Sequence, residues 1–310
     1  MSCTEGEIVV LEPSGRLPGL VEALRRHTLP ADAPLEMQRE RFETLAGAMP
    51  VHEAVSRRPL DAGGVAAECL EPSGGAAAGW ILYFHGGGYV IGSPTTIRAL
   101  AANLVAATGR RVVTVDYRLA PEHPCPAAVD DAVAAWAWLL GRGVDPAAAV
   151  FAGDSAGGGL TVAAMVAARD RGLPLPAAGV CLSPWVDLTL SGRSLDDNAA
   201  GDPEVNRHKL TRMAQDYLGG ADPRTPLASP VFADLTGLPP LLIQAGTAEA
   251  LADDARLLAA AAGKAGVDAT LELYRDMIHV WHAFAPGLPE ATATLKRITA
   301  WLATRAPTDG

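Results

Sequence analysis

The feature that most constrains the fold is a serine flanked by glycines within residues 150–158, VFAGDSAGG. A short apolar run ends there in the pattern Gly-x-Ser-x-Gly, and an alanine-rich stretch follows at once. This order predicts a buried strand, a sharp turn with Ser155 at its tip and then a helix, which is the arrangement of a nucleophile elbow. Gly153 and Gly157 would let neighbouring backbone approach the turn closely. The pattern is weak on its own in a chain with 32 glycines, so a nucleophilic Ser155 needs partners elsewhere.

Composition places the chain among globular proteins. Its 310 residues are 49% hydrophobic and 19% charged, which is enough to bury a large core. The net charge is −10 and no basic stripe is present, so we expect neither nucleic acid nor an anionic membrane as a partner. The first residues lack a secretory pattern, and no apolar run approaches the roughly 20 residues that span a bilayer.

The four cysteines, Cys3, Cys69, Cys125 and Cys181, are far apart in the sequence. They show neither a CxxC motif nor the spacing of a metal site. This predicts reduced thiols in a cytoplasmic protein.

Strand and helix patterns alternate through most of the chain, which predicts a mostly parallel eight-stranded sheet with helices on both faces. The first two expected strands form an antiparallel pair at the sheet edge. Strands are expected at 51–60, 64–71, 80–84, 111–116, 148–152, 178–182, 241–245 and 269–274, and helices at 94–108, 127–140, 156–171, 250–262 and 289–304.

Two segments fall outside this alternation. Residues 1–15 are expected to be poorly ordered, and two short helices divided by Pro30 and Pro34 fill residues 16–49. After the sixth strand comes an insertion rich in Pro, Gly and Asp, with one helical stretch at 205–218. We therefore expect a single domain over residues 1–310, with cap elements at about 1–50 and 184–230.

A glycine loop directly follows the strand at 80–84, in the sequence His85-Gly86-Gly87-Gly88. Its glycines leave backbone N–H groups unobstructed, as in the oxyanion loops of lipases and esterases. The expected oxyanion donors are the N–H groups of Gly87, Gly88 and Ala156. A plain glycine turn or a phosphate-binding loop is the alternative, although the Gly-Lys-Ser/Thr ending of a P-loop and the GxGxxG spacing are missing.

An activated serine needs a base, which is usually a histidine. His279 and His282 lie on the loop after the last expected strand, where the order Ser, acid, His places the base. His85 is expected to hold the glycine loop through hydrogen bonds. The other four histidines are expected to be surface or structural residues: His27, His52, His123 and His208.

The base in turn needs a carboxylate that fixes its tautomer. Three candidates, Glu249, Asp253 and Asp254, follow the strand at 241–245. Glu249 lies at the turn, whereas both aspartates fall inside the next helix, so Glu249 is the preferred acid and Asp253 the alternative. All three can also be read as helix-start carboxylates favoured by the helix dipole.

Taken together, these motifs resemble those of the hormone-sensitive-lipase-like family of bacterial carboxylesterases. The resemblance runs from about residue 80 to the final helix, whereas the caps match only in outline. Its motifs occur in family order: HGGGYVIGS at 85–93, DYRLAPEHPCPAAVDDA at 116–132, GDSAGGGL at 153–160, LSPWVDL at 182–188, GTAEALADDA at 246–255 and MIHVWHAF at 277–284.

The resemblance implies an α/β-hydrolase fold with Ser155 as nucleophile, His279 as base and Gly87, Gly88 and Ala156 as oxyanion donors. The family more often has Asp where this chain has Glu249, and this departure keeps Asp253 open as the acid. The resemblance also suggests that the polar residues of the motif at 116–132 brace the oxyanion loop.

The expected activity is hydrolysis of small, short-acyl esters without a metal or organic cofactor. The alternatives are hydrolysis of a lactone, an amide or an acetylated xenobiotic by the same residues, and a non-catalytic ligand-binding relative. Whether the protein forms a homodimer is left open, because the last strand and final helix are apolar enough to belong to either an interface or the core.

Overall fold

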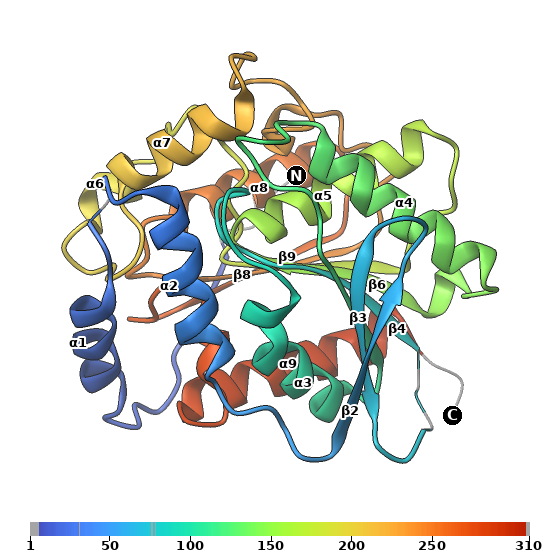
Figure 1. Cartoon of the computed structure of the whole chain (residues 1–310), viewed down its shortest axis with the longest axis horizontal. Helices are drawn as coiled ribbons and strands as arrows, with labels where there is room; N and C mark the ends of the chain where they lie inside the picture. Colours follow the sequence, from blue (N-terminus) through green and yellow to red (C-terminus); the bar gives the residue numbers. More distant parts are fainter. Residues whose placement is uncertain (1–5, 31, 76, 78, 308–310) are drawn as a thin grey trace.

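A nine-stranded sheet forms the centre of the computed structural model, which describes residues 6–30, 32–75, 77 and 79–307 (Figure 1). Its strand order is β1-β9-β8-β7-β6-β4-β5-β3-β2. All neighbouring strands are parallel except β3, which runs antiparallel to both β2 and β5. The strands are β1 (Glu7–Val9), β2 (Val55–Asp61), β3 (Ala66–Pro72), β4 (Trp80–Phe84), β5 (Arg111–Val115), β6 (Ala149–Asp154), β7 (Ala178–Leu182), β8 (Leu241–Gly246) and β9 (Ala269–Tyr274).

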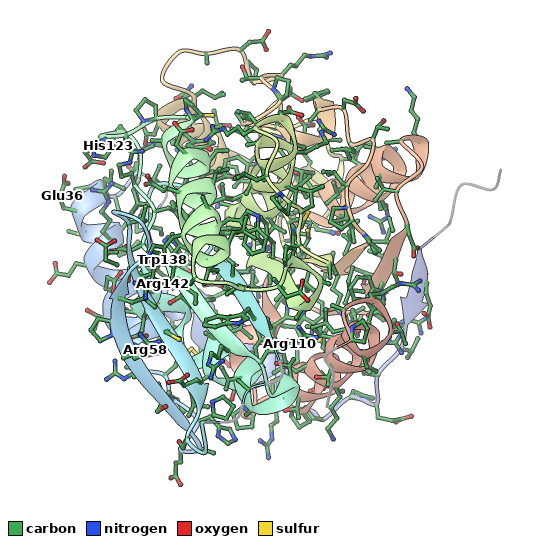
Figure 2. The ribbon with its side chains drawn as sticks, turned by 90° about the vertical axis from the view of Figure 1, so that its right-hand side faces the viewer. Glu36, Arg58, Arg110, His123, Trp138 and Arg142 are labelled. Atoms are coloured by element: carbon green, nitrogen blue, oxygen red, sulfur yellow. The ribbon has the colours of Figure 1, made fainter. Side chains whose placement is uncertain are left out.

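Helices cover both faces of this sheet, as expected for parallel strands that are buried on both sides. One face packs against α4 (Ala127–Gly141), α5 (Ala156–Asp170) and α8 (Ala252–Lys264). The other face packs against α3 (Pro94–Thr108) and α9 (Pro289–Arg305) (Figure 1). At the end of α4, the Arg142 guanidinium lies 4.8 Å from the centre of the Trp138 ring (Figure 2).

The remaining helices lie at one side of the sheet (Figure 1). They are α1 (Leu17–His27) and α2 (Leu35–Gly47) near the N-terminus, and α6 (Ser194–Asp197) and α7 (Arg207–Leu218) in the expected insertion. Arg39 of α2 connects this group to the main body, because it donates to the carbonyls of Val90 and Ala120 and to the Glu122 carboxylate. The assignment of cap elements at about 1–50 and 184–230 within a single domain stays a prediction.

The α/β-hydrolase architecture is confirmed, but the expected number of eight strands is wrong. Within the stretch expected to be poorly ordered, residues 7–9 form β1, which pairs with β9. A three-residue strand is too short for an alternating pattern to be recognised. The expected antiparallel pair at the sheet edge is confirmed as β2 and β3, with β2 outermost.

Three of the cysteines, Cys69, Cys125 and Cys181, are free thiols, and Cys3 lies outside the described residues. None of the helices in the described ranges is both long and apolar enough to cross a bilayer.

Candidate active site

Ser155 stands at the turn between β6 and α5, where the chain has to reverse direction sharply. Its backbone has φ +53° and ψ −121°, an unfavourable conformation for a residue with a side chain. Two neighbouring backbone segments hold this conformation. The Ser155 N–H donates to the Leu182 carbonyl at 2.9 Å, and the Ser155 carbonyl accepts from the Trp185 N–H at 2.9 Å.

Small residues on either side of Ser155 make the turn possible. A Cβ on Gly157 would lie 1.9 Å from the carbonyl oxygen of Phe84, the last residue of β4. A Cβ on Gly153 would lie 2.2 Å from the Gly157 carbonyl oxygen. Any larger residue at either position would push the end of β4, and the glycine loop after it, away from Ser155.

That glycine loop is tied to the residue before the serine. The buried Asp154 carboxylate accepts from the Tyr83 hydroxyl at 3.0 Å and from the Gly86 N–H at 3.1 Å. On the other side, the Tyr117 hydroxyl donates to the His85 carbonyl at 2.8 Å, and the two rings stack 4.1 Å apart. The loop is therefore fixed to the elbow, and the contacts of His85 fit its expected structural role.

Three N–H groups, on the glycine loop and at the start of α5, are the candidate oxyanion donors. Gly87 and Gly88 have φ of +115° and +61°, which favours glycine, and neither N–H donates to an acceptor within the described ranges. Ala156 is the first residue of α5, so its N–H has no acceptor within the helix. These are the three donors expected from the sequence.

The candidate base and acid meet at the ends of β8 and β9. The His279 Nδ1 atom lies 3.8 Å from Oε1 of Glu249, a side chain that is fully buried. Neither atom has another partner in the described structure. The second carboxylate oxygen, Oε2, accepts from the Ser183 hydroxyl at 2.8 Å and from the Gly246 N–H at 2.9 Å.

The alternative acids point elsewhere. Asp253 accepts from the Ser194 N–H at 2.9 Å and from the Arg256 guanidinium at 2.9 Å. Asp254 accepts from the N–H groups of Val186 and Asp187, at 2.9 and 3.0 Å. Of the three carboxylates considered, Glu249 is the one that faces His279.

The charges in this cluster act on the titration of the base. Burial lowers the pKa of His279, but the Glu249 carboxylate, with the charges of Asp202 and Glu204, outweighs burial and holds this pKa above its usual value of 6.5. Burial raises the pKa of Glu249, while His279 and the donors on Oε2 oppose that rise. The pair is therefore arranged to stabilise a proton on the imidazole.

The second candidate base, His282, lies in the core and contacts a different partner. It is fully buried, and its Nε2 atom lies 3.3 Å from the Gln244 side-chain oxygen. Burial, followed by the charge of His279, lowers the pKa of His282 to about 3. A histidine that stays neutral and is held by Gln244 fits a structural role.

Sequence reasoning missed the residues that hold the acid-bearing turn. Asn198 donates from its side-chain amide to the carbonyls of Thr247 and Glu249, at 2.9 and 2.8 Å. Asp202 accepts from the Ala250 N–H at 2.9 Å. Both residues belong to the expected insertion, about 50 positions before the turn, and no local pattern connects the two segments.

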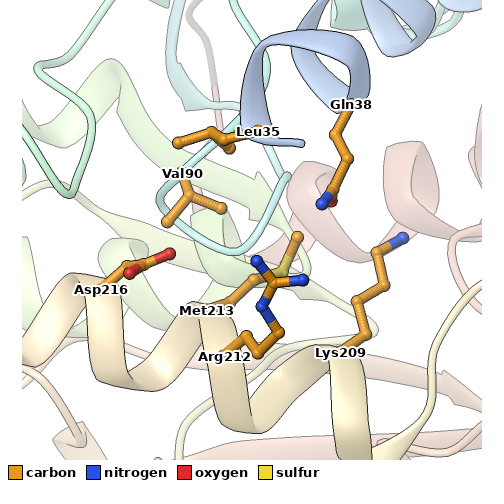
Figure 3. Close-up of a pocket in the computed structure, with 7 residues that line it drawn as sticks. All are labelled: Leu35, Gln38, Val90, Lys209, Arg212, Met213 and Asp216. Carbon is orange, nitrogen blue, oxygen red and sulfur yellow. The ribbon is translucent and has the colours of Figure 1, made fainter. Parts of the chain in front are cut away.

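A pocket opens between α2 and α7, next to Val90 (Figure 3). Val90 and Met213 both line it, and a Cβ on Gly88 would lie 2.2 Å from the Met213 sulfur. Met213 therefore lines this pocket and also lies next to the loop that carries the candidate oxyanion donors. The lining residues are Leu35, Gln38, Val90, Lys209, Arg212, Met213 and Asp216.

The chain is similar in sequence and in structure to known proteins of one fold family. Residues 81–283 match a family model described as the alpha/beta hydrolase fold. An acetyl-hydrolase of Streptomyces hygroscopicus is 52% identical over 224 residues, which cover 72% of this chain and 75% of that protein. An esterase of Acinetobacter venetianus is 34% identical over 258 residues, covering 83% and 85%. A crystal structure of an esterase from the bacterial hormone-sensitive lipase family is 47% identical, with a TM-score of 0.91 over 96% of this chain and 100% of that chain.

Proposed function

We infer that Ser155, His279 and Glu249 form the catalytic triad of this chain. The premise is that the chain belongs to the bacterial hormone-sensitive lipase family of α/β-hydrolases and is a carboxylic ester hydrolase. The observation that carries this inference is the contact between His279 Nδ1 and the otherwise unpartnered Glu249 Oε1, at the same edge of the sheet as the strained Ser155 turn.

In the proposed reaction, the Ser155 oxygen attacks the carbonyl carbon of the ester while His279 Nε2 takes the serine proton. The Glu249 carboxylate stabilises the imidazolium that forms. The imidazolium then gives its proton to the leaving alcohol, and an acyl group stays on Ser155. A water molecule deprotonated by His279 attacks this acyl-enzyme and releases the carboxylic acid with a free serine.

The N–H groups of Gly87, Gly88 and Ala156 are proposed to bind the oxyanion of both tetrahedral intermediates. Their support is geometric, because the loop and the elbow are joined through Asp154 and two of the three donors have no acceptor of their own. Each such donor contributes on the order of 3 kcal/mol to lowering the barrier.

The proposed substrates are small esters with a short acyl group. Met213 packs over Gly88, and the rings of Tyr89 and Tyr217 stack 3.8 Å apart in the core next to the loop. We propose that these buried side chains limit the length of the acyl chain that fits beside the oxyanion donors. The Streptomyces relative is named an acetyl-hydrolase, which supports a two-carbon acyl group. The same name makes acetylated compounds other than simple esters the second candidate class of substrate.

A substrate series tests this proposal. We expect kcat/KM for p-nitrophenyl esters to be highest with two to four acyl carbons and to fall steadily toward twelve. A parallel series of acetylated alcohols and acetylated amines separates the two candidates. A maximum at eight or more carbons would contradict the short-acyl proposal.

A further inference from the structure

Ser183 immediately follows β7 and is held in an unusual backbone conformation. Its φ is +46°, in the left-handed region that a residue with a side chain rarely adopts. The residue is fully buried, and its N–H donates to the Gln244 carbonyl of β8 at 2.7 Å. This backbone hydrogen bond fixes the direction of the side chain relative to the two adjacent strand ends.

The Ser183 hydroxyl makes two hydrogen bonds to segments that are far apart in the sequence. It donates to Glu249 Oε2 at 2.8 Å, and its oxygen accepts from the Val280 N–H at 3.1 Å. Val280 directly follows His279 and also has a left-handed conformation, with φ +48°. One hydroxyl therefore bridges the candidate acid and the backbone of the loop that carries the candidate base.

Because of this bridge, the two oxygens of the Glu249 carboxylate have different partners. Oε2 receives donors from Ser183 and Gly246, whereas Oε1 has none and faces His279 Nδ1. A carboxylate held by two donors on one oxygen cannot rotate freely. The free oxygen is thereby kept toward the imidazole.

We propose that Ser183 is a positioning residue for ester hydrolysis, which orients the Glu249 carboxylate and the His279 loop through one shared hydroxyl. This inference rests on the proposed triad. Ser183 is fully buried beneath these groups, so its removal should affect the chemical step more than substrate binding. Residues that orient metal ligands typically contribute 10- to 100-fold to activity, and we expect an effect of the same order here.

The variants Ser183→Ala and Ser183→Gly remove the hydroxyl, and glycine also relieves the left-handed backbone. Ser229→Ala is the matched control, because Ser229 is equally buried and its hydroxyl accepts one backbone hydrogen bond, from the Leu188 N–H at 2.8 Å. We expect kcat for p-nitrophenyl acetate to fall 10- to 100-fold in both Ser183 variants, with KM within about threefold. The control should keep wild-type kcat.

A proton NMR spectrum provides a second measurement, the chemical shift of the His279 Nδ1 proton, which a loss of packing elsewhere would not change. The Nδ1 proton of a histidine bonded to a carboxylate resonates at low field, and its assignment is checked by its loss in His279→Asn. We expect this resonance to shift or broaden in Ser183→Ala and Ser183→Gly, and to stay unchanged in Ser229→Ala. Thermal unfolding of each variant shows that it is folded.

The outcomes separate this inference from the proposed function. If Ser155→Ala is inactive but both folded Ser183 variants keep wild-type kcat and an unchanged resonance, the positioning role is wrong and the triad stands. If Ser155→Ala keeps wild-type activity, the proposed function itself fails. A loss of kcat in Ser183→Ala that Ser183→Gly restores would assign the effect to the backbone and overturn the role of the hydroxyl.

Discussion

Oε1 of Glu249 lies 3.8 Å from Nδ1 of His279, and both atoms are buried without another partner in the described structure. This separation is longer than a hydrogen bond, yet unpaired buried polar atoms are costly. Catalytic hydrogen bonds are often long without substrate and shorten in the substrate complex. The two atoms are therefore placed to pair when the imidazole becomes positively charged.

This relationship predicts which carboxylate acts as the acid. Replacing Glu249 with Gln keeps the shape but removes the negative charge that faces the imidazole, so we expect kcat for p-nitrophenyl acetate to fall by about 10³-fold or more. Asp253→Asn is the matched control and should stay within about threefold, because Asp253 binds Ser194 and Arg256 instead. A greater loss in Asp253→Asn than in Glu249→Gln would reverse the assignment.

The pH dependence of kcat/KM reports the protonation of the base. His279 has to be neutral to take the serine proton, and nearby carboxylates hold its pKa above the usual 6.5. Activity should therefore be lost as pH falls through a midpoint above 6.5. In Glu249→Gln the residual activity should show a lower midpoint, because the charge that favours the imidazolium is gone. A wild-type midpoint well below 6.5 would contradict the electrostatic account.

Alanine at Gly88 should damage the oxyanion loop. The new Cβ would lie 2.2 Å from the Met213 sulfur, at a φ of +61° that disfavours alanine. Displacement of this N–H should lower kcat by about 10²- to 10³-fold. Gly64→Ala is the control, because Gly64 has φ +90° but no atom within 4 Å of the new Cβ. It should lower stability by roughly 1 kcal/mol and leave kcat unchanged. Equal kcat in the two variants would show that the Gly88 N–H binds no oxyanion.

Asp254 should make stability decrease with rising pH. Burial raises its pKa to about 8, against an ordinary value of 3.8. The folded protein therefore holds a proton that the unfolded chain releases between these two values, and stability is lost as pH rises through this range. We expect the free energy of unfolding in urea to fall less between pH 5 and pH 8 in Asp254→Asn than in the wild type. An equal or steeper fall in the variant would show that Asp254 is ionised in the folded protein.

The elements that position the site could be predicted because their signals are local. The apolar run before Ser155 and the glycines around it define the elbow within nine residues, and β6 and α5 begin at or next to the expected positions. The strand β1 was not expected, because it is only three residues long and such a short segment shows no alternating pattern.

The acid remained ambiguous for a different reason. Glu249 and Asp253 are four residues apart, and local sequence alone does not say which carboxylate turns inward. The answer depends on Ser183 and Asn198, which contact the acid-bearing turn from 66 and 51 positions away. Such contacts are set by the arrangement of strand ends at one edge of the sheet, and a single sequence contains no signal for them.

The central claim, that Ser155 is the nucleophile, is tested most directly by labelling with diethyl p-nitrophenyl phosphate. This reagent transfers a diethylphosphoryl group to an activated serine and releases p-nitrophenolate. Intact mass and peptide mapping should show one adduct, located on Ser155, whose extent matches the loss of esterase activity, and Ser155→Ala should stay unlabelled. Inactivation with the adduct on another residue, or full esterase activity in Ser155→Ala, would contradict the account.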